Sequence, residues 1–242
     1  MTDLSNVLVP TTAEEAASAF GDGSGITILA GGTLVMSAIK LGRVRPERTL
    51  FLGKAGLAGI SRDNGTVRIG AMTPISALVD ATPEPLATFA RHVADHEIRS
   101  QATIGGNLCA PSGGTTPTGD LQAPLLALRA RVRSTGAGGE RTDSIDDFLA
   151  AGPEGRLVLE IEVDQPKRAS SAAVRRPHAH AYSVLAVAAA ETSDGVRVAV
   201  VGAGPRAVLV DDADPQDDAL ASAWYRAQVL PGLVTRALEG LR

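Results

Sequence analysis

One stretch of the chain, residues 98–128, constrains its fold and function more than any other. Between two apolar runs it carries five small or short polar residues: Thr103, Gly105, Gly106, Asn107 and Asp120. Glycines and short polar side chains allow a backbone to approach a ligand closely. We therefore expect a loop here whose backbone amides contact phosphate.

A second glycine turn lies nearer the N-terminus. The apolar run 26–29 leads into Ala30-Gly31-Gly32-Thr33, and a pattern typical of a helix continues through residue 41. A strand, a glycine turn and a helix start together form an anion site, because the first N–H groups of a helix have no partner within it. Two such turns predict that both bind one diphosphate.

Three motifs follow one another along the chain: Ala30-Gly31-Gly32-Thr33, the strand-like residues 67–73, and Ile98-Arg99 followed by residues 103–108. In this order and spacing they resemble the FAD-binding medium subunit of the molybdenum hydroxylases, the molybdopterin dehydrogenase family. That family includes the flavin subunits of carbon monoxide dehydrogenase and xanthine dehydrogenase. The resemblance covers nearly the whole chain and implies an α+β protein. It implies a two-subdomain FAD-binding fold of the PCMH, vanillyl-alcohol-oxidase-like type, then a small C-terminal domain with a three-stranded antiparallel sheet and helix.

The expected domains follow from the same resemblance and from the loop signals. Residues 1–54 form the first FAD-binding subdomain, residues 55–166 the second, and residues 171–242 a C-terminal domain that is shorter than usual in the family. The polar stretch 165–171 is the clearest boundary. The hydrophobic pattern predicts a helix from residue 13, a βαβ-like unit over 26–52, a hairpin turning at Asn64-Gly65, a helix over 86–96, strands at 130–134 and 157–163 around a helix starting near Ser144, three strands within 173–201, and a final helix containing Pro231.

The resemblance also implies the residues that hold the cofactor. The first turn is expected to bind the FAD diphosphate through the backbone of Leu29, Ala30, Gly31, Gly32, Thr33, Leu34 and Val35. The second is formed by Thr103, Ile104, Gly105, Gly106 and Asn107, with hydrogen bonds from the side chains of Thr103 and Asn107. Asp120 is expected to accept hydrogen bonds from ribityl or ribose hydroxyls. Leu34 replaces a residue that is usually small and polar in the family, and the loop 111–119 is longer than its family counterpart.

Catalysis is expected to belong to the flavin itself, with no residue assigned as the catalytic group. Arg176 matches a basic residue of the family near the flavin ring and is counted as cofactor-binding. His178 and His180 alternate on one side of an extended segment and are the candidates for a proton acceptor. An equally open alternative is that these side chains cover a domain interface.

The cysteine and histidine counts limit the metal chemistry of the chain. A single cysteine, Cys109, allows no intrachain disulfide and cannot supply the four thiolates of an iron–sulfur cluster. Any cluster therefore belongs to a partner, and Cys109 is interpreted as a buried structural residue. His92 and His96 stand four apart in the expected helix, but no third ligand is evident, so we expect solvent-facing or capping roles and no metal. FAD is expected to be non-covalent, because the glycine turns contain no histidine.

Composition excludes several classes of partner. The net charge is -4 with scattered signs, whereas nucleic-acid binding requires clustered Lys and Arg. No apolar run is long enough to span a membrane, and the first residues lack the basic and apolar regions of a signal peptide. We expect a cytoplasmic protein. The alternating arginines at 129–133 predict one solvated face of a strand.

The function implied by the resemblance is electron transfer. FAD links one-electron iron–sulfur carriers to two-electron acceptors, so this chain is expected to pass electrons between a partner's iron–sulfur centres and an acceptor such as NAD or dioxygen. The expected partners are an iron–sulfur small subunit and a molybdenum-cofactor large subunit, with NAD or a small-molecule substrate as ligand. Two alternatives stay open: a stand-alone FAD-dependent dehydrogenase or oxidase of a small organic substrate, and a non-catalytic FAD-binding scaffold.

Overall fold

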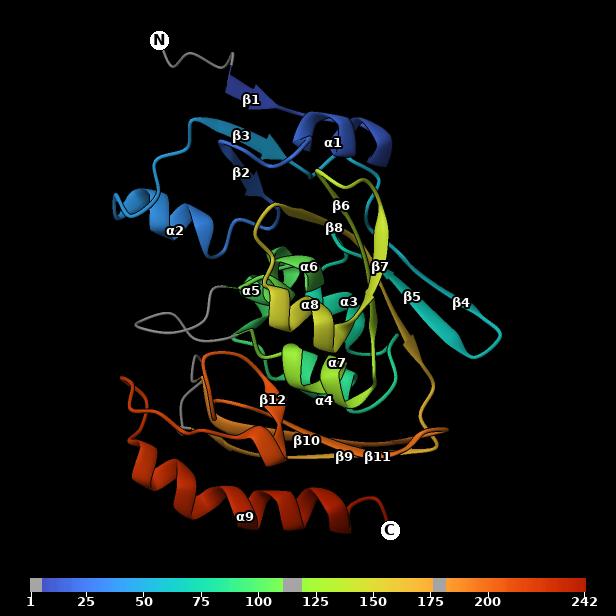
Figure 1. Ribbon diagram of the computed structural model, residues 1–242, viewed down its shortest axis with the longest axis vertical. Coiled ribbons are helices and arrows are strands. Elements are labelled where there is room, and N and C mark those ends of the chain that lie inside the picture. Colours follow the sequence, from blue (N-terminus) through green and yellow to red (C-terminus); the bar gives the residue numbers. More distant parts are fainter. Residues whose placement is uncertain (1–5, 111–118, 176–181) are drawn as a thin grey trace.

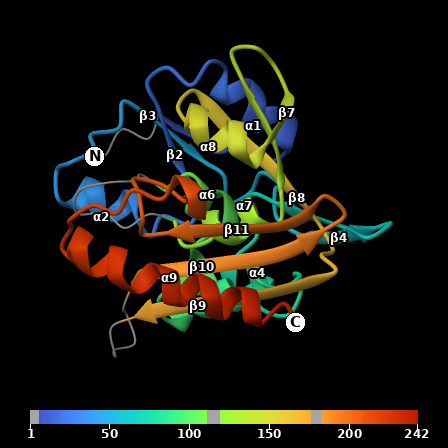
Figure 2. The same cartoon turned by 60° about the horizontal axis from the view of Figure 1, so that its bottom comes forward.

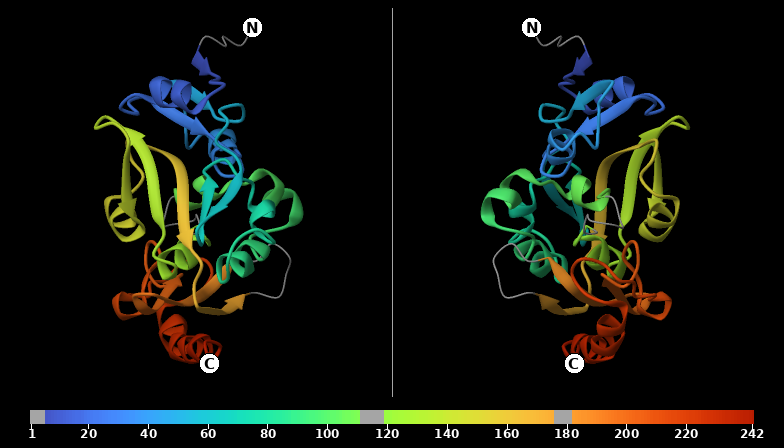
Figure 3. Two further views of the ribbon diagram at one scale, coloured as in Figure 1. Left: turned by 90° about the vertical axis from the view of Figure 1, so that its right-hand side faces the viewer. Right: turned by 90° about the vertical axis from the view of Figure 1, so that its left-hand side faces the viewer.

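The computed structural model describes residues 6–110, 119–175 and 182–242. Three β-sheets follow one another along the long axis of the molecule, as Figure 1 and the side views of Figure 3 show. The N-terminal sheet lies at the top of Figure 1, a five-stranded sheet and most of the helices lie in the middle, and the C-terminal sheet lies below them. Within the described ranges, no helix is both long and apolar enough to cross a membrane.

The first sheet is parallel and has the order β1-β3-β2, with β1 at Val7–Leu8, β2 at Ile26–Leu29 and β3 at Arg48–Phe51. Helix α2 (Val35–Lys40) joins β2 to β3, which confirms the predicted βαβ-like unit. Helix α1 (Ala13–Phe20) begins at Thr12, whose side chain accepts a hydrogen bond from the Glu15 N–H. Its buried residues pack against Leu50 of β3, so the first sheet and α1 share a small core.

The central sheet is antiparallel, with the order β4-β5-β8-β6-β7. Its strands are β4 (Ile60–Asp63), β5 (Thr66–Gly70), β6 (Arg131–Gly136), β7 (Arg141–Ser144) and β8 (Arg156–Asp164). The predicted hairpin is confirmed: Asn64 and Gly65 connect β4 to β5 with φ of 48° and 85°, the left-handed values that a tight two-residue turn requires. The local sequence therefore specified this turn.

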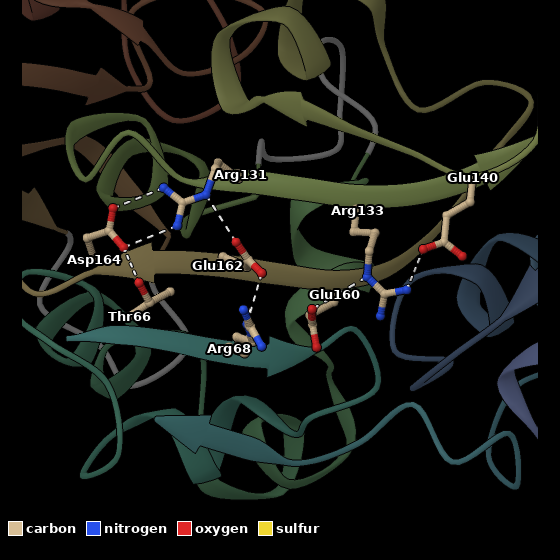
Figure 4. Close-up of polar contacts among 8 residues, drawn as sticks. All are labelled: Thr66, Arg68, Arg131, Arg133, Glu140, Glu160, Glu162 and Asp164. Carbon is tan, nitrogen blue, oxygen red and sulfur yellow. Dashed lines mark hydrogen bonds and ion pairs between the residues drawn. The ribbon is translucent and has the colours of Figure 1, made fainter. Parts of the chain in front are cut away.

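One face of the central sheet carries a ladder of ion pairs (Figure 4). Arg131 on β6 contacts Glu162 at 3.0 Å and Asp164 at 2.9 Å, and Glu162 also accepts from Arg68 of β5 at 3.0 Å. Arg133 bonds Glu140 at 2.6 Å and lies 3.5 Å from Glu160. The hydrogen bond from Arg131 holds the pKa of Asp164 below its ordinary value. Arg131 and Arg133 thus lie on the solvated strand face that the sequence predicted, whereas Arg129 precedes β6 and has a φ of 54°.

Six short helices pack beside the central sheet: α3 (Ile75–Leu78), α4 (Leu86–Arg91), α5 (His96–Gln101), α6 (Ile104–Leu108), α7 (Gln122–Ala127) and α8 (Ile145–Ala151). Their buried residues share the main core with β5, β6 and β8. Ser144 caps α8 by accepting from the Asp147 N–H, as predicted. The second glycine motif forms α6, and α6 lies directly against β8. Packing on the central sheet therefore fixes the position of this motif.

The predicted helix over 86–96 begins correctly but is too long, because α4 ends at Arg91 and a separate helix, α5, begins at His96. Ala94 adopts a φ of 39° between them, and Asp95 starts α5 by accepting from the Ile98 N–H. Arg99 holds the break, since its guanidinium donates to the carbonyls of Val93 and Ala94, each at 2.8 Å. The pattern of apolar residues could not reveal a turn that is stabilised by a side chain five residues away.

The C-terminal sheet is antiparallel, with the order β12-β11-β10-β9: β9 (Arg168–Arg175), β10 (Ser183–Thr192), β11 (Gly195–Val201) and β12 (Val208–Leu209). The three predicted strands are present, and the two-residue β12, too short to show a pattern, adds a fourth. After the short 3-10 helix η2 (Val210–Asp212), α9 (Ala223–Glu239) runs through Pro231 and lies across one face of the sheet (Figure 2). Helix α7, which follows the second glycine motif in the chain, packs on β10 and β11 of this sheet.

The strands of the first sheet lie within residues 7–51, those of the central sheet within 60–164 and those of the C-terminal sheet within 168–209. Strand β9 begins inside the polar stretch 165–171 that the sequence marked as a boundary. The limits of the domains, and the shortening of the third, stay predictions.

Candidate functional site

The two glycine motifs border a single cavity of about 490 Å³, a volume ordinary for a small-molecule site. The cavity lies where the first sheet, the helices around α6 and the start of β8 meet. Its wall contains most of the residues singled out from the sequence: Ala30, Gly31, Gly32, Thr33, Leu34, Val35, Thr103, Gly105, Gly106, Asn107 and Asp120. Leu29 and Ile104 are not among its lining residues, and Ile104 is fully buried in the main core instead.

Gly31 fixes how closely the two motifs approach each other. A Cβ atom at this position would lie 2.0 Å from the carbonyl oxygen of Gln101, the last residue of α5. No side chain fits at that separation, so only glycine allows the first turn to rest on the backbone that leads into Thr103. The first turn therefore lies against Gln101 and Ala102, directly before the second motif. That both turns bind one diphosphate stays a prediction.

The first turn leaves its backbone amides without partners. Gly32 has a φ of 75°, a left-handed value that glycine adopts without strain. Among the described residues, no acceptor receives a hydrogen bond from the N–H groups of Gly31, Gly32 or Thr33. All three residues line the cavity, so this turn has the unpaired donors that an anion site requires.

The second motif differs from the predicted loop, because residues 104–108 form the short helix α6. Its first amides already have acceptors: Ile104 donates to the Thr73 carbonyl at 3.1 Å and Gly105 to the Ala71 carbonyl at 2.9 Å. The Gly106 N–H donates to Thr103 Oγ1 at 3.1 Å. The expectation that this motif presents backbone amides is therefore wrong for these three groups. Because Oγ1 of Thr103 accepts this bond, its hydroxyl hydrogen is left to donate to a ligand.

Asn107 joins α6 to the segment that carries Asp120. Its Oδ1 atom accepts from the Leu121 N–H at 2.9 Å, and a Cβ at Gly119 would lie 1.8 Å from the Asn107 carbonyl oxygen. The close approach requires glycine at position 119. Because Oδ1 is engaged, the NH₂ group is the part of the Asn107 side chain that remains to donate to a ligand.

A family model described as the FAD binding domain in molybdopterin dehydrogenase matches residues 3–166. The chain belongs to this family. It is 33% identical over 182 residues to the uncharacterised protein YgfM of Escherichia coli strain K12, covering 71% of this chain and 67% of that protein. It is 27% identical to the 6-hydroxypseudooxynicotine dehydrogenase complex subunit alpha of Paenarthrobacter nicotinovorans, covering 96% of this chain and 92% of the relative.

The fold agrees with the sequence match. A solved carbon monoxide dehydrogenase from Hydrogenophaga pseudoflava superposes with a TM-score of 0.85 over 98% of this chain and 96% of that chain, at 24% identity. This flavoprotein is therefore an FAD-binding oxidoreductase subunit with the α+β fold expected from the resemblance. The cavity and the unpaired amides of the first turn fit a ligand with a diphosphate.

Asp120 gives the flavoprotein a carboxyl group with unusual acidity. It lines the cavity, and burial raises its pKa to about 6 despite the opposing charge of Arg175. Burial in turn lowers the pKa of Arg175, the last residue of β9. The carboxyl group therefore titrates near neutral pH, and it can accept a hydrogen bond from a ligand hydroxyl when ionised.

Three further side chains, to which sequence reasoning assigned no role, line this cavity or support the elements around it. Tyr182 lines it with 43% of its surface exposed, and Arg99 fixes the Val93–Ala94 wall through two carbonyls. Gln122, which is buried, donates from Nε2 to the Leu108 carbonyl at 2.9 Å and accepts from the Ala207 N–H at 3.2 Å. Its amide thus ties α6 to the C-terminal sheet. A glutamine at the start of an otherwise apolar helix is the sequence signal that could have indicated this link.

The remaining residues singled out from the sequence either have no reactive group available or lie outside the residues that the structure describes. Burial raises the pKa of the Cys109 thiol to about 12, so it stays protonated in the cavity wall. His92, directly after α4, and His96, the first residue of α5, are both exposed, and no group of described residues is arranged to hold a metal ion. Arg176, His178 and His180, and residues 111–118 of the longer loop, lie outside the described residues.

Proposed function

We propose that this chain is the flavin subunit of a molybdenum hydroxylase and passes electrons between a partner's iron–sulfur centres and an acceptor such as NAD or dioxygen. The observation that carries the proposal is the set of unpaired amides at residues 31–33, facing a cavity in a chain of this family. The relatives include a subunit of a dehydrogenase complex. The single cysteine of this chain leaves an iron–sulfur cluster to another subunit.

In this proposal the two motifs divide the work of binding the cofactor. The amides of Gly31, Gly32 and Thr33 donate to the FAD diphosphate, where several N–H groups converge on one anion. Thr103 and Asn107 add side-chain donors from the opposite wall. Leu34 offers only its backbone, since its side chain cannot hydrogen-bond.

Asp120 is proposed to accept from a ribose or ribityl hydroxyl. Its ionised form is the stronger acceptor, so FAD binding is expected to lower its pKa from about 6. When bound, FAD supplies the exchange of electrons one or two at a time. The chain's own residues hold the cofactor, exclude water from part of it and set the charge around it.

The partners in this proposal are an iron–sulfur small subunit and a molybdenum-bearing large subunit, with NAD or dioxygen as the final acceptor. Arg176, His178 and His180 keep their proposed place near the flavin ring. The cytoplasmic location also stays a prediction.

The test begins with the purified chain and FAD. We expect one FAD per chain, released on acid precipitation because the attachment is non-covalent. The loaded protein should be reduced anaerobically by a one-electron donor such as reduced methyl viologen and should remain oxidised with small organic substrates. Bleaching of the flavin by an organic substrate alone would favour the stand-alone enzyme, and failure to bind FAD would overturn both redox functions.

A further inference from the structure

Gln122 is a buried polar side chain in a helix that is otherwise apolar. It is the first residue of α7, and the five residues that follow it in this helix are all apolar and buried. Only 3% of Gln122 is exposed. A buried amide destabilises a protein unless both its donor and its acceptor have partners. Both have partners here, and the two partners belong to different parts of the molecule.

The amide of Gln122 fills the space between α6 and the C-terminal sheet. Its Nε2 donates to the carbonyl of Leu108, the last residue of α6, at 2.9 Å, and its Oε1 accepts from the N–H of Ala207, between β11 and β12, at 3.2 Å. Leu108 and Ala207 are both buried. Among the described residues, neither of these backbone groups has another hydrogen-bond partner. Figure 1 shows α7 between α6 and this sheet.

On the α6 side, the same segment carries the cavity residue Asp120. The N–H of Leu121 donates to Asn107 Oδ1 at 2.9 Å, and Gly119 lies against the Asn107 carbonyl. The residues before and after Asp120 are therefore both held by the end of α6, and the Gln122 amide adds a third contact there. The place of Asp120 in the cavity wall follows from these contacts.

On the side of the C-terminal sheet, the loop between β11 and β12 also contacts the segment of a second cavity residue. Gly202, at the start of this loop, has a φ of 89°, and a Cβ there would lie 2.4 Å from the Val184 carbonyl oxygen. Val184 follows the cavity residue Tyr182 by two positions. One loop therefore holds the segment of Tyr182 and, through Gln122, the segment of Asp120.

We propose that Gln122 is a positioning residue for FAD, which fixes the segment of Asp120 against the loop between β11 and β12. The inference rests on the proposed contact between Asp120 and FAD. Gln122 does not line the cavity, so it acts through the residues that it holds. Coupling of this kind is reciprocal: if the Gln122 link favours FAD binding, bound FAD stabilises the link by the same factor.

The first test is Q122M in the full chain. Methionine has a similar length but cannot replace the amide, so the Leu108 carbonyl and the Ala207 N–H both lose their partner. FAD affinity, measured by fluorescence titration, should fall by about tenfold or more, the affinity equivalent of one buried polar group left unpaired. Circular dichroism verifies that the variant is folded.

The second test uses hydrogen exchange and begins with the wild type, so it needs no variant to fold. Saturating FAD should slow exchange in the peptide that contains Ala207 by about tenfold, because the coupling is reciprocal. In Q122M this slowing should disappear, whereas FAD at saturation should still slow exchange at residues 31–33. A general loss of structure would change both peptides.

The matched control is S170A, which weakens the C-terminal domain without touching the link. The Ser170 hydroxyl on β9 donates to the Ala237 carbonyl on α9, so this variant also loses one hydrogen bond of the domain. It should retain FAD affinity within about twofold, as expected for sites without shared partners, and should keep the slowing at Ala207.

Two measurements made first test the proposed function separately: the wild type must bind FAD, and Asp120→Ala must bind it more weakly. Failure of either overturns the cofactor contacts on which the inference rests. With both established, unchanged FAD affinity in Q122M overturns the positioning role alone. So does a wild-type chain in which FAD leaves exchange at Ala207 unchanged, or an S170A variant that loses affinity and slowing as Q122M does.

Discussion

The two glycine motifs that border the cavity use their backbone amides in opposite ways. In the first turn the N–H groups of residues 31–33 donate to no described acceptor, whereas in the second those of residues 104–106 are all engaged within the chain. The first turn continues into α2, which has no buried residue, and the second forms α6, three of whose residues are buried. One motif is arranged to receive a ligand and the other to support the site.

The glycines differ for the same reason. Gly105 packs against Ala71, where a Cβ would lie 2.9 Å from both the side chain and the carbonyl oxygen, so it serves the fold. Gly31 allows the close contact with the backbone before the second motif, and Gly32 adopts the positive φ that the first turn requires. Similar glycine pairs in a sequence therefore do not imply similar use of the backbone. The four predictions below test this contrast, from the largest expected effect to the smallest.

Replacing Gly31 by alanine should have the largest effect. The new Cβ would lie 2.0 Å from the Gln101 carbonyl oxygen, and neither backbone can move without separating the two motifs. Overpacking of this kind costs about 3 kcal/mol or more, and we expect FAD affinity to fall by about 100-fold or more. Fluorescence titration with FAD measures it. Gly138→Ala, where a Cβ meets nothing within 4 Å, is the control and should bind FAD normally.

Asp120 should make the stability of the FAD-free protein depend on pH. Its pKa is about 6 in the folded chain against an ordinary value of 3.8, so folding favours the protonated carboxyl. Stability is then highest below about pH 4, falls between about pH 4 and 6, and the loss is complete above about pH 6.

The size of this loss is about 3 kcal/mol, from a difference of about two pKa units. Asp120→Asn should remove it, raising the free energy of unfolding at pH 8 while leaving it nearly unchanged at pH 4. Urea denaturation at the two pH values measures the effect. An equal change at both pH values would show that the carboxyl does not titrate as inferred.

Thr103→Val should weaken the supporting motif by a smaller amount. Valine keeps the shape but removes the Oγ1 acceptor of the Gly106 N–H, a helix cap worth about 1 kcal/mol. We expect a lower melting temperature and an FAD affinity reduced about fivefold. Thr103→Ser retains the oxygen and should behave like the wild type. A serine variant as impaired as the valine variant would show that the loss does not come from the Oγ1 cap alone.

Cys109→Ser should have the smallest effect on FAD binding. The thiol's pKa of about 12 keeps it neutral at physiological pH, so no thiolate is lost. We expect stability to change by less than about 1.5 kcal/mol, as for other near-isosteric changes, with FAD affinity unchanged. Alkylation of the wild-type thiol at pH 8 should be slow. A large loss of FAD in this variant would contradict the structural role.

Local chemistry determined the elements that the sequence predicted correctly. The Asn64-Gly65 hairpin, the helix after Thr12 and the helix after Ser144 each depend on residues within four positions of one another. The strands of the C-terminal sheet show their apolar character in the same local way. The order of three motifs along the chain was enough to indicate the family, because each motif is contiguous in sequence.

Tertiary contacts decided what the sequence could not. The break between α4 and α5 depends on Arg99 bonding carbonyls across a turn, and the amides of Ile104 and Gly105 are satisfied by the chain near Ala71. The contact of Gly31 with Gln101 and the link through Gln122 join segments at least 14 residues apart. Hydrogen-bond partners and exposure are properties of the packed chain, so the same glycine pattern became a ligand site in one place and a support in the other.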